Sequence, residues 1–160
     1  MSEHRVWVAS VEEAEEVTRL LLGFRNNLGY DWPSDQDFTD GVAKLISGDS
    51  TDYLLGAVAD GPAVGVCQLR FRYGLWQAGN DCLLEDLFVE EPARGSGLGR
   101  AMTEFAVQHA STTRDCRRIE LDVNEANEPA LKLYESLGFG IKNSHGGRDL
   151  YLRRNLSAEA

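Results

Sequence analysis

Three alternating glycines, Gly95, Gly97 and Gly99, form the part of this sequence best suited to bind a charged ligand. Arg94 and Arg100 flank them in the run ARGSGLGR. Because glycine lacks a Cβ, such a run curls tightly and brings several backbone N–H groups close to one ligand. The two arginines add positive charge beside these donors. The segment therefore predicts an anion-binding turn, and phosphate oxygens are its natural ligands.

The elements on either side of this turn would aim it at the ligand. Residues 82–89 are mostly apolar and predict a strand that leads into the glycines. Residues 99–113 predict a helix, because Met102, Phe105, Ala106 and Ala110 recur at helical spacing. A helix that begins there directs its positive dipole end and its free N–H groups into the turn. The expected order is strand, phosphate-binding turn, helix.

Two other phosphate-binding patterns fit these residues poorly. The dinucleotide-binding turn needs G-x-G-x-x-G near the start of a βαβ unit, whereas this chain has G-x-G-x-G. The nucleoside-triphosphate loop needs G-x-x-x-x-G-K followed by Ser or Thr. No Lys-Ser or Lys-Thr pair follows the glycines. Both alternatives are therefore disfavoured.

A second pattern follows the predicted helix. Residues 118–124 alternate as a strand should, and Asn127, Ala130, Tyr134 and Gly138-Phe139 then fit N-x-x-A-x-x-x-Y-x-x-x-G-F. Together with R-G-x-G-x-G, this pattern resembles the signatures of the GCN5-related N-acetyltransferase (GNAT) superfamily. The resemblance covers residues 83–139, about a third of the chain. It implies that acetyl-coenzyme A (acetyl-CoA) is the cosubstrate.

The resemblance also implies an α/β GNAT fold, in which a mixed central β-sheet is splayed at the cofactor cleft and flanked by helices. The two strands that splay would be residues 82–89 and 118–124, with the thioester between them. We expect a single domain over residues 1–160, in the element order β-α-α-β-β-β-α-β-α-β-β. The other expected elements are strands at 5–9, 53–59 and 63–73, helices at 11–27 and 35–47, and a final hairpin of residues 139–143 and 149–153.

The same resemblance implies which residues bind the cosubstrate. Backbone groups of the strand would pair with the pantetheine arm as an added strand does, and the amides of the turn would bind the pyrophosphate. Residues of the second pattern would line the thiol end. In chain order these residues are Leu87, Phe88, Val89, Arg94, Gly95, Ser96, Gly97, Leu98, Gly99, Arg100, Asn127 and Ala130.

Acetylation of an amine requires a base, because an alkylammonium group with a pKa near 10.4 is almost fully protonated at pH 7. Glu85 is the candidate, since similar enzymes with an L-E-D-x-F-V strand carry an acidic residue that faces the acceptor there. In a regular strand Asp86 would point to the opposite face, although a β-bulge could exchange the two roles. The alternative for Glu85 is an exposed carboxylate in an ion pair.

Tyr134 is the candidate general acid, because the sulfur of departing coenzyme A needs a proton and a nearby phenol can donate one. Its apolar neighbours on the short helix leave a packing role open. Cys82 and Cys116 have no adjacent His that would activate a thiol. We therefore expect direct transfer in a ternary complex, without an acetyl-enzyme.

Two sets of residues predict different acceptors. Asp31, Trp32 and Asp35 could hold a cation by charge and by the ring face of Trp32. Arg70 and Arg72 lie on one strand face by their period of two and could hold the carboxylate of an amino-acid or peptide-like acceptor. The sequence around Glu85 resembles the diamine and polyamine acetyltransferase branch, but the two arginines would suit a polycation poorly. Both sets could also be structural.

Composition limits the remaining partners. The net charge of −10 argues against a nucleic-acid partner, because binding a phosphate backbone requires a basic face. No run of 18 apolar residues and no secretory leader is visible, so we expect a cytoplasmic protein without a membrane partner. The three histidines are scattered and predict no metal site. The three cysteines are interpreted as reduced packing residues.

We expect a homodimer, paired through a sheet edge or through residues 149–153. The predicted function is transfer of the acetyl group of acetyl-CoA to a primary amine of a small molecule, such as an amino acid, a diamine or a polyamine. Two alternatives stay open. The chain could acetylate a protein or peptide, or it could be a non-catalytic sensor that binds coenzyme A.

Overall fold

The computed structural model describes residues 3–157, and the chain divides into two units between Leu121 and Asp122. The first unit contains one five-stranded sheet in the order β1-β2-β3-β4-β5. All neighbours pair antiparallel except β4 and β5, which are parallel. The strands are β1 (His4–Val8), β2 (Thr51–Val58), β3 (Gly65–Gly74), β4 (Gly79–Val89) and β5 (Cys116–Leu121).

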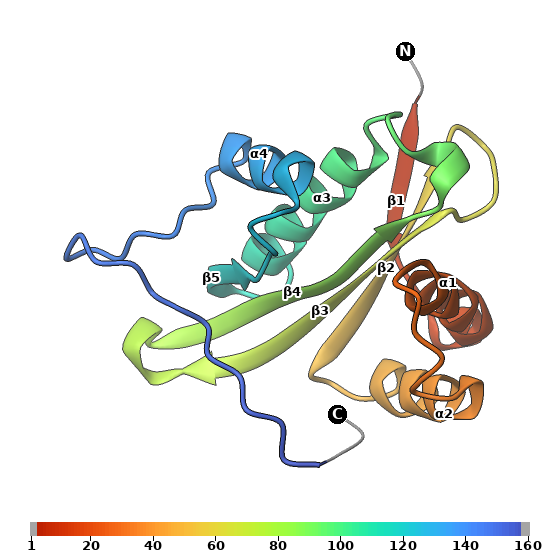
Figure 1. Cartoon of the computed structure of the whole chain (residues 1–160), viewed down its shortest axis with the longest axis horizontal. Helices are drawn as coiled ribbons and strands as arrows, with labels where there is room; N and C mark the ends of the chain where they lie inside the picture. The colour runs from red at the N-terminus through yellow and green to blue at the C-terminus, as the bar shows by residue number, and fades with distance from the viewer. Residues whose placement is uncertain (1–2, 158–160) are drawn as a thin grey trace. The chain divides into compact units, whose positions relative to one another are not determined.

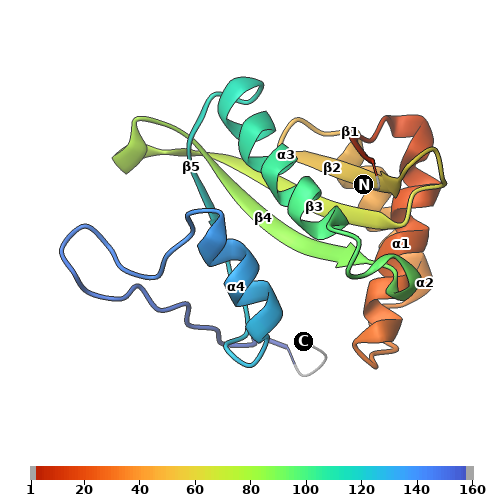
Figure 2. The ribbon, with the colours of Figure 1, turned by 90° about the horizontal axis from the view of Figure 1, so that it is seen from above.

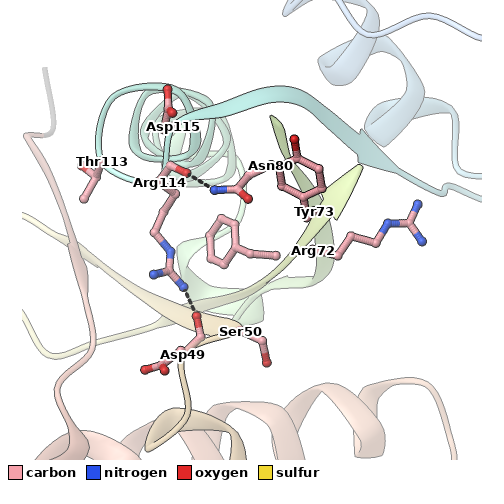
Figure 3. A pocket seen from close by; sticks show the side chains of 9 residues that line it. Asp49, Ser50, Arg72, Tyr73, Asn80, Thr113, Arg114 and Asp115 are labelled. Carbon is pink, nitrogen blue, oxygen red and sulfur yellow. Dashed lines mark hydrogen bonds between the residues drawn. The ribbon is translucent and has the colours of Figure 1, made fainter. Parts of the chain in front are cut away.

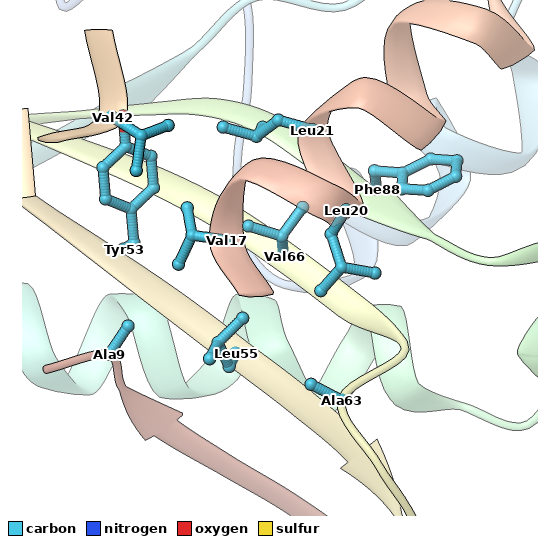
Figure 4. Packing of buried hydrophobic residues seen from close by; sticks show 10 residues of the cluster. All are labelled: Ala9, Val17, Leu20, Leu21, Val42, Tyr53, Leu55, Ala63, Val66 and Phe88. Carbon is cyan, nitrogen blue, oxygen red and sulfur yellow. The ribbon is translucent and has the colours of Figure 1, made fainter. Parts of the chain in front are cut away.

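Three α-helices cover the two faces of this sheet, α1 (Ala14–Asn27) and α2 (Asp35–Ile46) on one side and α3 (Leu98–Thr112) on the other (Figure 1 and Figure 2). Short 3-10 turns are η1 (Val11–Glu13), η2 (Leu75–Gln77) and η3 (Glu91–Ala93). Because successive residues of a strand point to opposite faces, each face collects its own core. Figure 4 shows the core under α1 and α2, where Val17, Leu20, Leu55 and Val66 are fully buried.

The second core lies under α3 and is built from the alternate residues of the same strands. Leu54, Cys67 and Leu69 pack there with Met102 and Ala106 of the helix. The apolar spacing predicted for residues 99–113 is therefore the buried face of α3. Packing against the sheet holds this helix immediately after the glycine-rich turn.

The sheet opens along β4. Strand β5 pairs with β4 only from Asn80 to Leu84, so the remainder of β4 has a partner on one side alone within the first unit. A register shift in the β3–β4 pairing falls at the same place, because Gln68 pairs with Glu85 whereas Val66 pairs with Phe88. This β-bulge places two residues of β4 opposite one of β3. The splay predicted between β4 and β5 is therefore confirmed.

Sequence patterns located these elements to within a few residues. The helix expected at residues 11–27 starts with a capping box of Ser10 and Glu13, and its first turn is the 3-10 turn η1 rather than α-helix. The strand expected at residues 118–124 begins and ends earlier, at Cys116–Leu121. Among residues 3–157, no helix is both long enough and apolar enough to cross a membrane.

In the described part of the second unit, residues 122–157, there is one helix, α4 (Glu128–Ser136), whose N-cap is Asn127. The prediction of a final hairpin was wrong. In residues 139–153 the backbone forms a single antiparallel bridge, between Lys142 and Arg148, and no strand. The Asn143 side chain accepts hydrogen bonds from the N–H groups of His145 and Gly147 and closes a tight turn. The turn forms, but its two arms do not pair further.

Candidate active site

The glycine-rich turn has the geometry of an anion-binding site. Gly95 and Gly97 have φ angles of 76° and 92°, in the left-handed region that favours glycine. A Cβ built on Gly95 or Gly99 would meet no atom within 4 Å, so the turn leaves open space there. Helix α3 begins at Leu98, and its first turn contains no acidic residue that would repel an anion. These features fit a pyrophosphate group.

His4 supports this turn from the first strand, which sequence reasoning had missed. Its Nε2 lies 2.9 Å from the carbonyl oxygen of Ser96. A carbonyl only accepts, so this nitrogen is the donor. The ring also lies against Gly97, where an added Cβ would approach Cε1 within 3.2 Å. No local signal in the sequence links His4 with residues so far along the chain.

Arg94 connects the turn to its surroundings. Its Nε donates to the carbonyl oxygen of Val89 at 3.0 Å, and its Nη2 donates to the Asn27 side chain at 3.2 Å. Its guanidinium also lies 5.7 Å from the ring centre of Phe88, which stacks on Phe24. These contacts orient Arg94 along the end of β4. Its proposed role as a phosphate ligand stays a prediction.

Glu85 lies at the bulge, on the last regular pair before the register shifts. Tyr53 pairs with Gln68 and Gln68 with Glu85, so the three side chains form a row across one face of the sheet. The carboxylate of Glu85 is partly exposed, and its Oε2 lies 3.7 Å from Nη1 of Arg70. The structure therefore brings together two of the predicted site residues, Glu85 and Arg70.

Asp86 occupies the bulge itself, with φ of 52° and an exposed side chain. A non-glycine residue rarely adopts this conformation. Burial raises the pKa of the Tyr53 phenol to about 12, and the negative charge of Asp86 is the next cause. A regular strand was the premise for placing Asp86 on the opposite face, and the bulge removes that premise.

The predicted acceptor residues Asp31 and Trp32 lie in the loop between α1 and α2, and both are exposed. Arg25 holds this loop. Its Nη1 donates to the carbonyl oxygen of Pro33 at 2.6 Å, and its Nη2 lies 2.8 Å from the Asp35 carboxylate. The motifs did not reveal these contacts of Arg25 with the loop.

Three predicted residues, Asn127, Ala130 and Tyr134, belong to the second unit. Asn127 caps α4, since its side chain accepts a hydrogen bond from the N–H of Ala130 at 3.3 Å. Tyr134 is half-buried and meets Phe139 edge to face, with 5.8 Å between the ring centres. The local pattern N-x-x-A therefore has a structural basis as a helix cap.

All three cysteines are free thiols, as expected for packing residues. Burial raises the pKa of the Cys82 thiol to about 12 and that of Cys67 well above its usual value. Both thiols are therefore protonated near pH 7, which makes them poor nucleophiles. This agrees with direct acetyl transfer.

A pocket of about 390 Å³ lies elsewhere in the first unit, between the β3–β4 hairpin and the loop after α3 (Figure 3). Arg114 donates to the carbonyl oxygen of Asp49 at 2.6 Å and lies 4.1 Å from the Phe71 ring centre. Of the predicted site residues, this pocket includes Arg72 alone. The lining residues are Asp49, Ser50, Phe71, Arg72, Tyr73, Asn80, Thr113, Arg114 and Asp115.

The structure thus combines a sheet that opens beside β4 with a glycine-rich turn at the start of α3, as the resemblance to the GNAT superfamily implied. The model of the Acetyltransferase (GNAT) family matches residues 14–139. The chain therefore belongs to the GNAT acetyltransferase family.

The chain resembles curated relatives over limited segments. It is 38% identical over 56 residues to the spermine/spermidine N(1)-acetyltransferase of Bacillus subtilis (strain 168). It is 47% identical over 51 residues to the mycothiol acetyltransferase of Thermomonospora curvata. These matches cover 35% and 32% of this chain, but only 37% and 17% of the two relatives. The substrates in their names are therefore not transferred directly.

Solved structures agree over nearly the whole chain. A provisionally assigned acetyltransferase from Arthrobacter sp. FB24 matches with a TM-score of 0.84 and 25% identity, covering 95% of this chain and 96% of that one. An aminoglycoside acetyltransferase from an uncultured soil metagenomic sample matches with a TM-score of 0.80 and 12% identity, over 96% and 97% of the two chains. The second match supports the fold alone.

Proposed function

We propose that this protein is an acetyl-CoA-dependent N-acetyltransferase that acts on a primary amine of a small molecule. One observation carries the proposal. The carboxylate of Glu85 lies at the bulge where β4 loses its β5 partner, on the strand that leads into the glycine-rich turn. A base at this position would face an acceptor beside the opened sheet.

The backbone would hold the cosubstrate at two places. The turn of Gly95, Ser96 and Gly97, with the first residues of α3, would bind the pyrophosphate. Leu87 and the rest of the β4 segment that has no β5 partner would bind the pantetheine amides by strand addition. Asn127 and Ala130 would line the thiol end, as the family resemblance implies.

When bound, acetyl-CoA supplies the acetyl group, whose carbonyl carbon bonds to the amine nitrogen as its carbon–sulfur bond breaks. Glu85 would accept the proton that the acceptor ammonium must lose before attack, directly or through water. Tyr134 would donate a proton to the departing sulfur. A backbone N–H at Leu87 or Phe88 would stabilise negative charge on the carbonyl oxygen. The amine nitrogen loses a second proton as the amide forms, and this proton would replace the one that Tyr134 gives to the sulfur. The proton taken by Glu85 would then pass to solvent, so each turnover of an ammonium acceptor releases one proton.

The test is a thiol-release assay with acetyl-CoA and a panel of amines, with calorimetry of acetyl-CoA binding in parallel. The panel contains amino acids, diamines, polyamines, aminoglycosides and lysine peptides. Turnover of a small amine supports the proposal, and turnover of peptides alone favours a protein acetyltransferase. Tight acetyl-CoA binding without turnover favours the sensor, and absence of binding overturns the cosubstrate assignment.

We also propose a homodimer located in the cytoplasm. Apolar side chains near the end of the described chain support an association, since Leu150, Tyr151 and Leu152 are each at least 69% exposed. Such a segment offers both side chains and unpaired backbone groups to a partner. The three free thiols suit a reducing compartment. Light scattering coupled to size exclusion measures the oligomeric state.

A further inference from the structure

Two arginines of β3 share the sheet face that carries Glu85. Arg70 and Arg72 are two residues apart, and Arg70 is also two residues from Gln68, the direct partner of Glu85. Arg70 lies 3.7 Å from the Glu85 carboxylate, and its side chain is 52% exposed. It is therefore adjacent to the proposed base and still accessible from solvent.

Arg72 extends this positive stripe. Its side chain is exposed, and among residues 3–157 no ion pair forms with it. Asp81, the residue of β4 that pairs with Arg72, instead forms an ion pair with Arg118, with 2.9 Å between Oδ2 and Nη2. Figure 3 shows the Arg72 side chain at the edge of the pocket described above, extending away from Arg114. A protein of net charge −10 thus presents two exposed guanidinium groups on the sheet face of its proposed base, and Arg70 is the one that contacts it.

The contact between Arg70 and Glu85 can be exchanged at low cost. Solvent-exposed ion pairs contribute little to stability, and a separation of 3.7 Å is longer than a direct charge-assisted hydrogen bond. A guanidinium that binds a ligand carboxylate through two parallel N–H···O bonds gains more. An acceptor carboxylate would therefore compete well with Glu85 for Arg70.

We propose that the acceptor is a primary amine that also carries a carboxylate, and that Arg70 and Arg72 bind this carboxylate. This inference rests on the proposed function, because it concerns the acceptor of that same site. Movement of Arg70 from Glu85 to the ligand would take one cation away from the Glu85 carboxylate, which favours its uptake of the ammonium proton. A polyamine would instead place its cationic groups beside two guanidinium groups.

The test compares each amino acid with its carboxamide and with the corresponding decarboxylated amine. Acceptor binding is measured by calorimetry and kcat/KM by thiol release, in the wild-type protein and in Arg70→Gln and Arg72→Gln. For each protein, kcat/KM for the amino acid is divided by kcat/KM for its carboxamide. The ratio in a variant is then divided by the ratio in the wild type, so that differences in the chemical reactivity of the two amines cancel. The matched control is Arg5→Gln, which removes an exposed arginine from β1. Thermal unfolding checks that each variant folds.

We expect the wild-type protein to prefer acids over amides by about 10- to 100-fold, the range for hydrogen bonds between charged groups. Arg70→Gln should remove most of this preference, Arg72→Gln part of it, and Arg5→Gln none. Equal use of acids and amides, or a preference for diamines, overturns this inference and leaves the proposed function intact. Failure of acetyl-CoA to bind overturns the proposed function itself.

Discussion

Glu85 lies where the pairing of β4 changes on both sides, next to the bulge that Asp86 occupies. It is the last residue of β4 in register with β3 before the bulge, and it follows the last pair with β5 at Leu84. Its ion pair with Arg70 agrees with the structural alternative considered for an exposed strand carboxylate. The proposed role of Glu85 is to accept the proton of the acceptor ammonium, and this role can be tested by substitution.

Replacement of Glu85 by Gln should lower acetylation most near neutral pH. At higher pH a larger fraction of the amine is already deprotonated, so the base becomes less necessary and the rate should partly recover. The pH profiles of kcat/KM for the wild type and Glu85→Gln measure this. Asp86→Asn is the matched control, because Asp86 is the adjacent carboxylate in the bulge. A wild-type profile in Glu85→Gln, with the recovery seen in Asp86→Asn instead, would assign the base to Asp86.

His4 should influence cosubstrate binding without any part in proton transfer. Its hydrogen bond to Ser96 orients the turn, and a neutral hydrogen bond contributes about 1 kcal/mol, so its loss should weaken binding by about 3- to 10-fold. Calorimetry of acetyl-CoA binding to His4→Ala measures the effect. His4→Gln keeps a donor and should restore most of the affinity. An unchanged affinity in His4→Ala would mean that the turn holds its shape without this contact.

At the scale of the elements, the site depends on β4 and α3. The bulge in β4 places Asp86, which has a positive φ, where the sheet opens. The apolar face of α3 packs on the sheet and so holds the start of the helix beside the glycine-rich turn. The glycines connect the two elements. A glycine can contribute to the turn by adopting a positive φ or by leaving space for a ligand, and substitutions can distinguish these two contributions.

Gly95→Ala and Gly99→Ala should both weaken acetyl-CoA binding, but only Gly95→Ala should lower the melting temperature. An added Cβ meets no neighbour at either position. Gly95 has φ of 76°, where alanine is strained by about 1 to 2 kcal/mol. Gly99 lies in the first turn of α3, where alanine favours helix. Thermal unfolding with calorimetry on both variants tests this, and equal destabilisation would contradict it.

At the scale of the molecule, the sheet separates two cores, and neutral ionisable groups are buried in both. Tyr53 lies under α1 and α2, whereas Cys67 and Cys82 lie under α3. Burial raises the pKa of each of the three groups because it disfavours their charged forms. Stability must therefore depend on pH in the alkaline range.

The free energy of unfolding should fall as pH rises above about 9. The pKa of Cys82 rises from 9.0 to about 12, so between these values the unfolded thiol loses its proton while the folded one keeps it. The folded state then binds more protons, and stability falls with pH, whereas below pH 9 the contribution is fully present. Urea unfolding from pH 7 to pH 11 measures the decline. Cys82→Ala should show a shallower decline, and an identical slope would contradict the assignment.

The sequence alone determined the local parts of this protein. Positive φ at glycines and the apolar periods of 2 and 3.6 depend on neighbouring residues, so the strand, the glycine-rich turn and α3 could be predicted with nearly correct boundaries. Tertiary structure decided the rest. The bulge at Asp86, the Arg70–Glu85 pair and the support of Ser96 by His4 join residues far apart in the chain. The sequence also predicted a hairpin of residues 139–143 and 149–153, but the backbone pairs only at Lys142 and Arg148. An alternating pattern shows that a segment could form one face of a sheet, but it does not specify a partner strand.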